Sequence, residues 1–245
     1  MSARCTNRRR SERTVSSEVY LVLGTKPWNR RVFDEVIIKW PGRWHFIGER
    51  EALTVAAVQR LSPRFLFFMH WSWKVPEEII ASQECVCFHM TDVPYGRGGS
   101  PLQNLILRGH RETKLTALRM TREFDAGPVY LKESLSLEGS AEEILIRGSE
   151  LCAQMIRRLI TEKPRARPQC GPVTLFKRRQ PGESEIPTLP SLERLHDFMR
   201  MLDADGYPPA FIDHKGFRYE FSRAGLYDGR LLADVKITRI QETNA

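Results

Sequence analysis

The sequence has no apolar run near the ~18 residues that a membrane-spanning helix requires, so we expect no membrane partner. It has no internal repeat, which argues against a repeat architecture. Its five cysteines form an odd set without a CxxC pair, so we expect no metal site. Cys85 and Cys87 alternate with apolar neighbours, which predicts buried thiols. This use of cysteine fits a reducing, cytoplasmic location.

Net charge is also low outside the first residues. The formal net charge is +8, and five arginines against Glu12 place +4 of it within residues 1–16. The rest is too thinly spread to predict a nucleic-acid-binding face, and it suits small-molecule substrates, phosphorylated ones included. Residues 1–16 contain almost no apolar side chains and are predicted to form a disordered leader.

Residues 17–165 show a regular succession of apolar and amphipathic segments. Apolar or alternating runs predict strands at 19–24, 44–48, 65–71, 85–88, 113–120 and 128–137. Segments with helical spacing lie between them, at 28–38, 51–61, 77–81 and 100–108. A further helix is predicted after the capping box that Ser140 and Glu143 can form. The order predicts an α/β domain with a Rossmann-like, mostly parallel sheet flanked by helices.

The composition changes at Pro164, after which prolines recur up to Pro190. Residues 166–245 are therefore predicted to form a small β-rich C-terminal subdomain with a proline-rich connector. A helix is expected at 192–202 and strands at 217–221 and 231–237. An exposed edge of these strands would allow a homodimer.

Five polar residues lie at the ends of predicted strands: His70, His89, Asp92, Arg97 and Asp125. In open α/β sheets, ligands bind beyond the carboxyl ends of the strands. A histidine beside a carboxylate is a common acid/base pair, because the carboxylate orients the ring and stabilises its protonated form. Asp92 is three residues from His89, and Asp125 ends a separate strand, so both remain candidate partners.

The segment that begins at His89 has a specific spacing, with Pro94, Arg97-Gly98, Pro101 and Gln103 following in turn. It resembles the H…P…RG…P…Q signature of the folate-dependent formyltransferase family, which includes methionyl-tRNA formyltransferases and sugar nucleotide N-formyltransferases. Phe124-Asp125-Ala126-Gly127 is similar to the family's Leu-Asp-Thr-Gly segment. The resemblance covers residues 19–163 and implies an enzyme that uses N10-formyltetrahydrofolate as co-substrate.

The resemblance also assigns roles to residues. It implies that His89 and Asp125 are catalytic. The folate would lie against Asp125 and the loop after the third predicted strand, which holds His70, Trp71, Ser72, Trp73 and Lys74. The acceptor would contact the glycine-rich turn and a later basic pair, namely Pro94, Tyr95, Gly96, Arg97, Gly98, Gly99, Gln103, Arg178 and Arg179. Glycines in the turn would let the backbone approach a substrate closely.

One position departs from the family pattern. Cys87 stands two residues before His89, where the family has an asparagine whose amide helps to hold the oxyanion. Loss of one such donor can lower the rate by ~10²–10³, and a thiol donates only weakly. Cys87 therefore leaves open a catalytically weak relative that only binds folate or a nucleotide.

The C-terminal segment bears on the amine acceptor. The residues after 164 are too few for the tRNA-binding domain of methionyl-tRNA formyltransferases, and residues 176–186 resemble a segment of the sugar nucleotide enzymes. We therefore expect an acceptor of the 4-amino-4,6-dideoxy sugar nucleotide type, as in cell-surface polysaccharide biosynthesis, and no nucleic-acid partner. The alternatives are methionyl-tRNA and a purine-pathway glycinamide.

Overall fold

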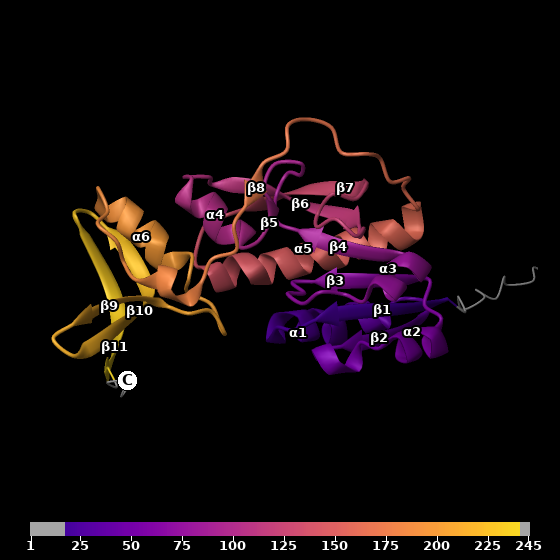
Figure 1. Cartoon of the computed structure of the whole chain (residues 1–245), viewed down its shortest axis with the longest axis horizontal. Helices are drawn as coiled ribbons and strands as arrows, with labels where there is room; N and C mark the ends of the chain where they lie inside the picture. Colours follow the sequence, from indigo (N-terminus) through magenta and orange to yellow (C-terminus); the bar gives the residue numbers. More distant parts are fainter. Residues whose placement is uncertain (1–17, 241–245) are drawn as a thin grey trace, which may run out of the picture.

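Six strands form the central sheet of the computed structural model, which describes residues 18–240. The sheet order is β2-β1-β3-β4-β6-β7 (Figure 1). The strands are β1 Val19–Gly24, β2 Arg43–Ile47, β3 Phe65–Met69, β4 Cys85–His89, β6 Glu112–Arg119 and β7 Val129–Ser136. The leader predicted for residues 1–16 lies outside the described residues.

The strand directions confirm a Rossmann-like, mostly parallel sheet. β1 is parallel to β2 and β3, and β3 is parallel to β4. β6 is antiparallel to both β4 and β7. A short loop joins β6 to β7, and a connection of this length can join only antiparallel neighbours. The carboxyl ends of β3 and β4 therefore lie at the same edge of the sheet.

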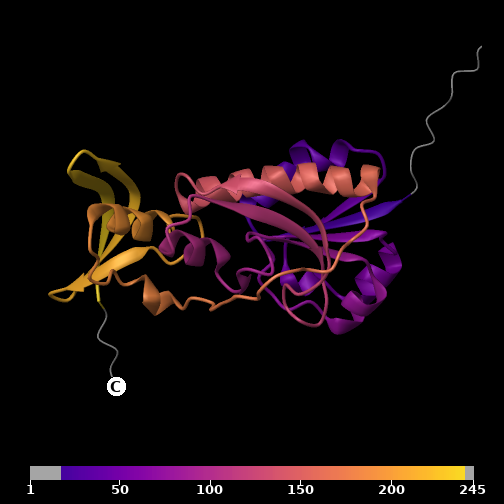
Figure 2. The same cartoon turned by 90° about the horizontal axis from the view of Figure 1, so that it is seen from above.

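Helices cover both faces of the sheet (Figure 2). The apolar stripes of α1 (Pro27–Glu35) and α5 (Ala141–Glu162) belong to the larger buried cluster, with Phe67 and Phe88 from the strands. The smaller cluster, which includes Phe68 and Cys85, packs under α2 (Val55–Leu61) and α3 (Glu77–Ser82). The predicted capping box begins α5, since Ser140 Oγ accepts from Glu143 N and Glu143 Oε2 accepts from Ser140 N.

The remaining elements around the central sheet are short. α4 (Pro101–Leu107) follows β5 (Arg97–Gly98), and 3₁₀ turns at Ile37–Lys39 and Arg50–Ala52 replace parts of the longer helices that the spacing predicts. The connector after α5 runs back over the sheet to β8 (Leu175–Phe176), which pairs in parallel with β5 (Figure 1). The connector is therefore bonded to the unit that contains the central sheet well beyond residue 166, where the composition places the start of the C-terminal subdomain.

The C-terminal unit is a three-stranded antiparallel sheet with one helix packed on it, which confirms the β-rich appendage. A 3₁₀ turn at Pro181–Ser184 precedes α6 (Leu192–Arg200), and the strands are β9 (Ala210–His214), β10 (Phe217–Tyr227) and β11 (Arg230–Arg239). The sequence pattern did not predict β9, because its apolar residues follow Pro208-Pro209 directly. Among the described residues, no helix is long and apolar enough to cross a membrane.

A buried arginine of α6, paired with an aspartate of the same helix, joins the two units. Arg200 and Asp197 are 3% and 4% exposed, and Arg200 Nε donates to Asp197 Oδ1 at 2.7 Å. Arg200 Nη1 also donates to the main-chain oxygens of Leu137 at 2.6 Å and Gly139 at 2.8 Å, between β7 and α5. Arg111, which is largely exposed, contacts Asp197 from outside at 3.4 Å. The bonds from Arg200 to Leu137 and Gly139 thus attach α6 to the end of the central sheet, and Asp197 balances the buried charge.

We predict that Arg200→Met lowers the free energy of unfolding by about 3–5 kcal/mol, because Asp197 would stay buried without its main partner. Urea denaturation would measure the change. Arg31→Met removes an exposed ion pair to Glu35 and should change stability little. The double variant Asp197→Leu/Arg200→Met should recover part of the loss; an equally large loss would show that packing, and not the unpaired charge, sets the cost.

Candidate functional site

The site forms around His89, the last residue of β4. The His89 side chain is 9% exposed, and its two ring nitrogens face different oxygens. Nε2 lies 2.8 Å from the main-chain oxygen of Gly96, which can only accept, so Nε2 carries a proton. Nδ1 lies 3.5 Å from Asp125 Oδ1. A doubly protonated ring can donate to both oxygens.

Asp125, and not Asp92, is the carboxylate that faces His89. The Asp92 carboxylate pairs with Lys132 Nζ at 2.5 Å. Asp125 lies in the loop between β6 and β7, and its second oxygen accepts a hydrogen bond from Gly98 N at 2.9 Å. His89 and Gly98 therefore hold one carboxylate from two sides. The choice that the sequence leaves open is decided by the fold.

The glycine-rich turn that supplies this N–H is fixed by the connector. Gly96 N and Arg97 N both donate to the Thr174 main-chain oxygen at 3.0 Å. Gly98 has φ +105°, and a Cβ there would lie 2.5 Å from the Phe176 main-chain oxygen. Only glycine can occupy this position, since a side chain would displace β8 from the turn.

Cys87 lies on the same face of β4 as His89. It packs with Trp71 and Met120 against the smaller buried cluster. Burial raises the pKa of the Cys87 thiol far above its ordinary value, and the negative charge of Asp125 raises it further. The thiol is therefore neutral near pH 7 and is neither a nucleophile nor a metal-binding thiolate.

The predicted folate loop presents an aromatic surface. Trp71 packs edge-on against Trp73, with ring centroids 5.0 Å apart. Trp71 Nε1 is buried and has no hydrogen-bond partner among the described residues, whereas Ser72, Trp73 and Lys74 are exposed. An apolar face with an unused N–H donor beside it fits a flat heterocycle with acceptor atoms, such as a pterin. The residues present therefore fit the folate that the sequence pattern implies.

His70 follows β3, and its ring lies against α1 and α5. Its backbone has φ +51°, which turns the ring toward α1 and α5. There Nδ1 lies 3.1 Å from Asn29 Nδ2, and that amide also donates to Ser149 Oγ at 2.9 Å. Burial lowers the pKa of His70 from 6.5 to about 4, and the positive charge of Lys26 adds to the effect. His70 is thus a neutral packing residue.

Several predicted acceptor contacts are also engaged elsewhere. Gln103 is 4% exposed and donates to the Met201 main-chain oxygen at 3.1 Å, so it joins α4 to the C-terminal unit. Tyr95 packs against Phe176 and reaches His110 at 3.1 Å. Arg179 bonds the Glu183 main-chain oxygen and lies over the Phe198 ring, away from His89. The substrate-binding role of Gln103 and Arg179 stays a prediction, and in this structure both side chains already have partners within the chain.

The other predicted contacts remain near the turn. Pro94 precedes Tyr95 and accepts from Thr174 N at 3.2 Å through its main-chain oxygen. Arg178 is exposed and packs beside Gly99, close to the start of α4. Pro94, Gly96, Gly98, Gly99 and Arg178 are thus the predicted acceptor contacts that stay on the side of the site.

Sequence reasoning missed two side chains that hold the site. Asn104 Nδ2 donates to the main-chain oxygens of Gly99, Ser100 and Lys177 at 3.0–3.2 Å. Gln169 bonds Arg97 and the Asp125 loop. Neither residue carries a local signal, because amides in loops are common and these partners lie up to 73 positions away.

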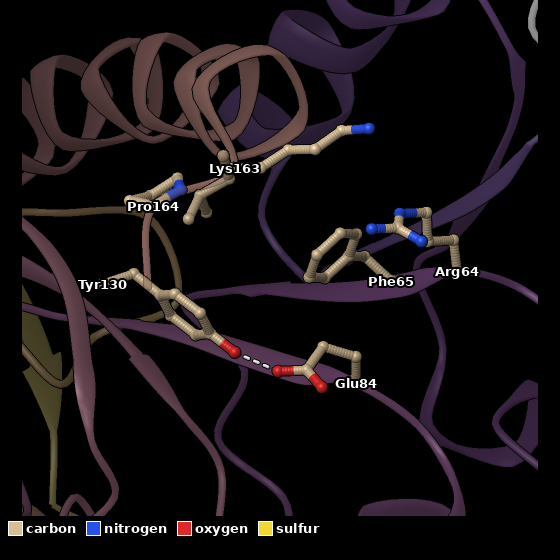
Figure 3. A pocket seen from close by; sticks show the side chains of 7 residues that line it. Arg64, Phe65, Glu84, Tyr130, Lys163 and Pro164 are labelled. Carbon is tan, nitrogen blue, oxygen red and sulfur yellow. Dashed lines mark hydrogen bonds between the residues drawn. The ribbon is translucent and has the colours of Figure 1, made fainter. Parts of the chain in front are cut away.

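A separate cavity of about 340 Å³ lies at the opposite, amino end of the strands. Arg64, Phe65 and Tyr130 line it, and Tyr130 donates a hydrogen bond to Glu84 (Figure 3). It shares no residue with the His89 site. No cluster of three or more His, Cys, Asp or Glu side chains that could hold a metal occurs within residues 18–240.

Comparisons with known proteins agree with this geometry. A solved methionyl-tRNA formyltransferase from Clostridium thermocellum is 41% identical to this chain, with a TM-score of 0.86 and coverage of 91% of this chain and 99% of that one. A curated methionyl-tRNA formyltransferase from Sinorhizobium medicae is 33% identical over 130 residues, which are 51% of this chain and 40% of that protein. The chain thus spans less than half of the curated relative that it matches.

A family model described as the C-terminal domain of methionyl-tRNA formyltransferase matches residues 181–238. A solved 4-N formyltransferase from Francisella tularensis is 14% identical, with a TM-score of 0.64 and coverage of 81% of this chain and 93% of that one, which is a likeness of fold alone. The expectation that this chain is most similar to sugar nucleotide enzymes is therefore wrong. The sequence suggests that the residues after 164 are too few for the tRNA-binding domain of a methionyl-tRNA formyltransferase. Residues 181–238 nevertheless match the family model of that enzyme's C-terminal domain.

The pKa of His70 predicts a loss of stability in acid. Between pH 6.5 and about 4 the unfolded chain binds a proton on this histidine and the folded protein does not. The contribution of the neutral His70 to the free energy of unfolding is therefore complete above pH 6.5 and is lost as the pH falls toward 4. The loss should reach about 3 kcal/mol. Urea denaturation at a series of pH values would measure this loss in the native protein and in His70→Asn. Asn is chosen because it tolerates a positive φ.

The native protein should lose stability more steeply than His70→Asn over this range. The exposed His214, changed to Asn, is the matched control and should keep the native slope. Equal slopes for all three proteins would contradict the assignment.

Proposed function

The chain belongs to the formyltransferase family, and on this premise we propose that it transfers a formyl group from N10-formyltetrahydrofolate to the amine of a methionyl-tRNA. The observation that carries the chemistry is the His89–Asp125 pair, held at the carboxyl edge of the sheet by Gly98. The likeness over 99% of a methionyl-tRNA formyltransferase supports the acceptor. A cytoplasmic location is part of this proposal.

Asp125 is the proposed base. The neutral amine nitrogen attacks the formyl carbon, and its lone pair forms the new C–N bond while the carbonyl becomes an oxyanion. The proton that the nitrogen loses passes to the Asp125 carboxylate, and the oxyanion then reforms the carbonyl as the bond to N10 of the folate breaks. N10 leaves with that electron pair and takes the proton from Asp125, which gives tetrahydrofolate and restores the carboxylate.

His89 is the proposed donor to the oxyanion. Its Nε2–H is committed to Gly96, but the Nδ1 contact with Asp125, at 3.5 Å, is longer than the 2.7–2.9 Å of a tight charge-assisted bond. The Nδ1–H can therefore turn to an oxyanion that forms beside Asp125. Such a pre-placed donor in a site with little water stabilises the charge that develops in the transition state.

Methionyl-tRNA replaces the amino sugar nucleotide as the preferred acceptor, and with it a tRNA replaces the expectation of no nucleic-acid partner. The support is the sequence match of residues 181–238, together with the 41% identity. The amino sugar nucleotide remains the second candidate, since the turn around Gly98 and Arg178 carries no group that distinguishes the two amines. A relative without catalysis is the third outcome.

The test is an acceptor assay. The full-length protein would be mixed with N10-formyltetrahydrofolate and either methionyl-tRNA or amino sugar nucleotides, and mass spectrometry would detect the gain of one formyl group. Uncharged tRNA and free methionine are the controls. Transfer to methionyl-tRNA is the expected result. Transfer only to a sugar, or none at all, would overturn the proposal.

Asp125→Asn should lower kcat by ~10²–10⁴, because the amide cannot take up the proton of the attacking amine. Asp92→Asn is the matched control: this neighbouring carboxylate pairs with Lys132 and should leave kcat nearly unchanged. Steady-state kinetics with the acceptor identified above would measure both. A larger loss of kcat for Asp92→Asn than for Asp125→Asn would show that Asp92, and not Asp125, is the base.

Cys87→Ala should lower kcat by less than about tenfold, since a neutral thiol contributes at most one weak hydrogen bond. Single-turnover kinetics would measure the effect on the chemical step. The exposed Cys170, changed to Ala, is the control. Complete inactivity of a folded Cys87→Ala protein would show that the thiol takes part in the reaction.

A further inference from the structure

The proposed base sits on a backbone that needs support. Asp125 has φ +54°, a left-handed conformation that is uncommon for residues other than glycine. Two residues later, Gly127 is pressed against β6, where an added Cβ would lie 1.8 Å from the Arg119 main-chain oxygen. Such a backbone persists only where surrounding contacts fix it, and these clusters of strain occur at functional sites.

Gln169 supplies contacts on both sides of Asp125. Its amide nitrogen donates to the main-chain oxygen of Asp125 at 2.7 Å and to that of Gly127 at 2.8 Å. Both protons of one amide group are thus used on the same short loop. Within residues 18–240, no other side chain donates a hydrogen bond to the main-chain oxygens of Asp125 and Gly127.

The other end of the same amide is also held. Gln169 Oε1 accepts from Arg97 Nε at 3.1 Å and from Arg97 Nη2 at 2.9 Å. Arg97 Nη1 contacts Glu123, inside the Asp125 loop, at 3.6 Å. The assignment of the amide oxygen and nitrogen follows from these partners, because a guanidinium only donates and a carbonyl only accepts.

The connector that carries Gln169 is itself fixed. Arg167 and Val129, at the start of β7, exchange two main-chain hydrogen bonds of 2.7 and 2.8 Å. Farther on, β8 pairs with β5, which contains Arg97. Gln169 is therefore held between two paired points, with Arg97 on one side and the Asp125 loop on the other.

We infer that Gln169 is a positioning residue for formyl transfer: it holds the Asp125 carboxylate toward His89, and Arg97 orients the Gln169 amide. This inference rests on the proposed function. It gives Arg97 a role through Gln169 in place of the direct substrate contact that the sequence pattern suggests. A displacement of the base of about 1 Å can lower the rate ~10²-fold, which is the effect such a contact prevents.

Three variants separate the parts of this arrangement. Gln169→Ala removes every bond, whereas Gln169→Glu keeps an acceptor for Arg97 but loses both donors to the loop. Arg97→Met keeps the loop donors but frees the amide to rotate. Gln154→Ala, on the exposed side of α5, is the matched control.

We expect Gln169→Ala and Gln169→Glu to lower kcat ~10–100-fold, with the KM for the folate changed by less than about threefold. The double variant Arg97→Met/Gln169→Ala should be no worse than Gln169→Ala, because the two residues act through one contact. Gln154→Ala should match the native protein. A native kcat in Gln169→Glu, or a change confined to KM, would overturn the inference.

Hydrogen exchange provides a readout without catalysis. The amides of residues 121–128 should exchange faster in Gln169→Glu than in the native protein, while those of β4 stay protected. If the native protein transfers no formyl group but this difference is found, the proposed function fails and the loop contact stands. If the native protein is active and both readouts are unchanged in Gln169→Glu, the inference about Gln169 fails alone.

Discussion

The hydrogen bond from Gly98 N to the Asp125 carboxylate is the contact on which the site depends. It joins the turn after β4 to the loop after β6, and it brings Asp125 within 3.5 Å of His89, the last residue of β4. The geometry leaves no freedom at Gly98, since β8 packs where a side chain would be. Sheet order therefore matters more than local sequence here. β4 and β6 are antiparallel neighbours, so the loop after β6 starts beside the amino end of β4 and reaches back to His89.

The connector between α5 and the C-terminal unit contacts the loops that form the site. Gln169 and Thr174 bond the two loops that carry Asp125 and Gly98, and β8 pairs with the turn itself. Farther along, Arg200 fastens α6 to the end of β7 through a buried charge. A proline-rich stretch that looks like a linker is thus bonded to the site, and the C-terminal unit after it is attached separately, through Arg200.

The sequence predicted what depends on local periodicity and spacing. The strands and the Ser140 capping box follow from side-chain alternation and from one reciprocal pair of hydrogen bonds. His89 and Asp125 were found through a spacing that resembles a family, but physics alone left Asp92 as an equal candidate until Lys132 was seen to hold it. The direction of the His70 ring was not predictable, because it follows from a positive φ that the sequence pattern does not indicate. The contacts of Gln169 and Arg200 across the fold were not predictable, because the main-chain oxygens of Asp125 and Leu137 that they bond lie more than 40 positions away.

Cys87 bears on how much of the rate the remaining groups must supply. A neutral thiol cannot replace the two donors of an amide, so in the proposed mechanism the oxyanion depends on His89 Nδ1–H. Donors of this kind stabilise a transition state only if they need no reorganisation when charge develops. The close packing of Gly98 against β8 and the amide of Gln169 on the Asp125 loop both reduce that reorganisation. With one donor fewer, the rigidity of the surrounding loops becomes the larger contribution, and the contacts of the connector gain importance accordingly.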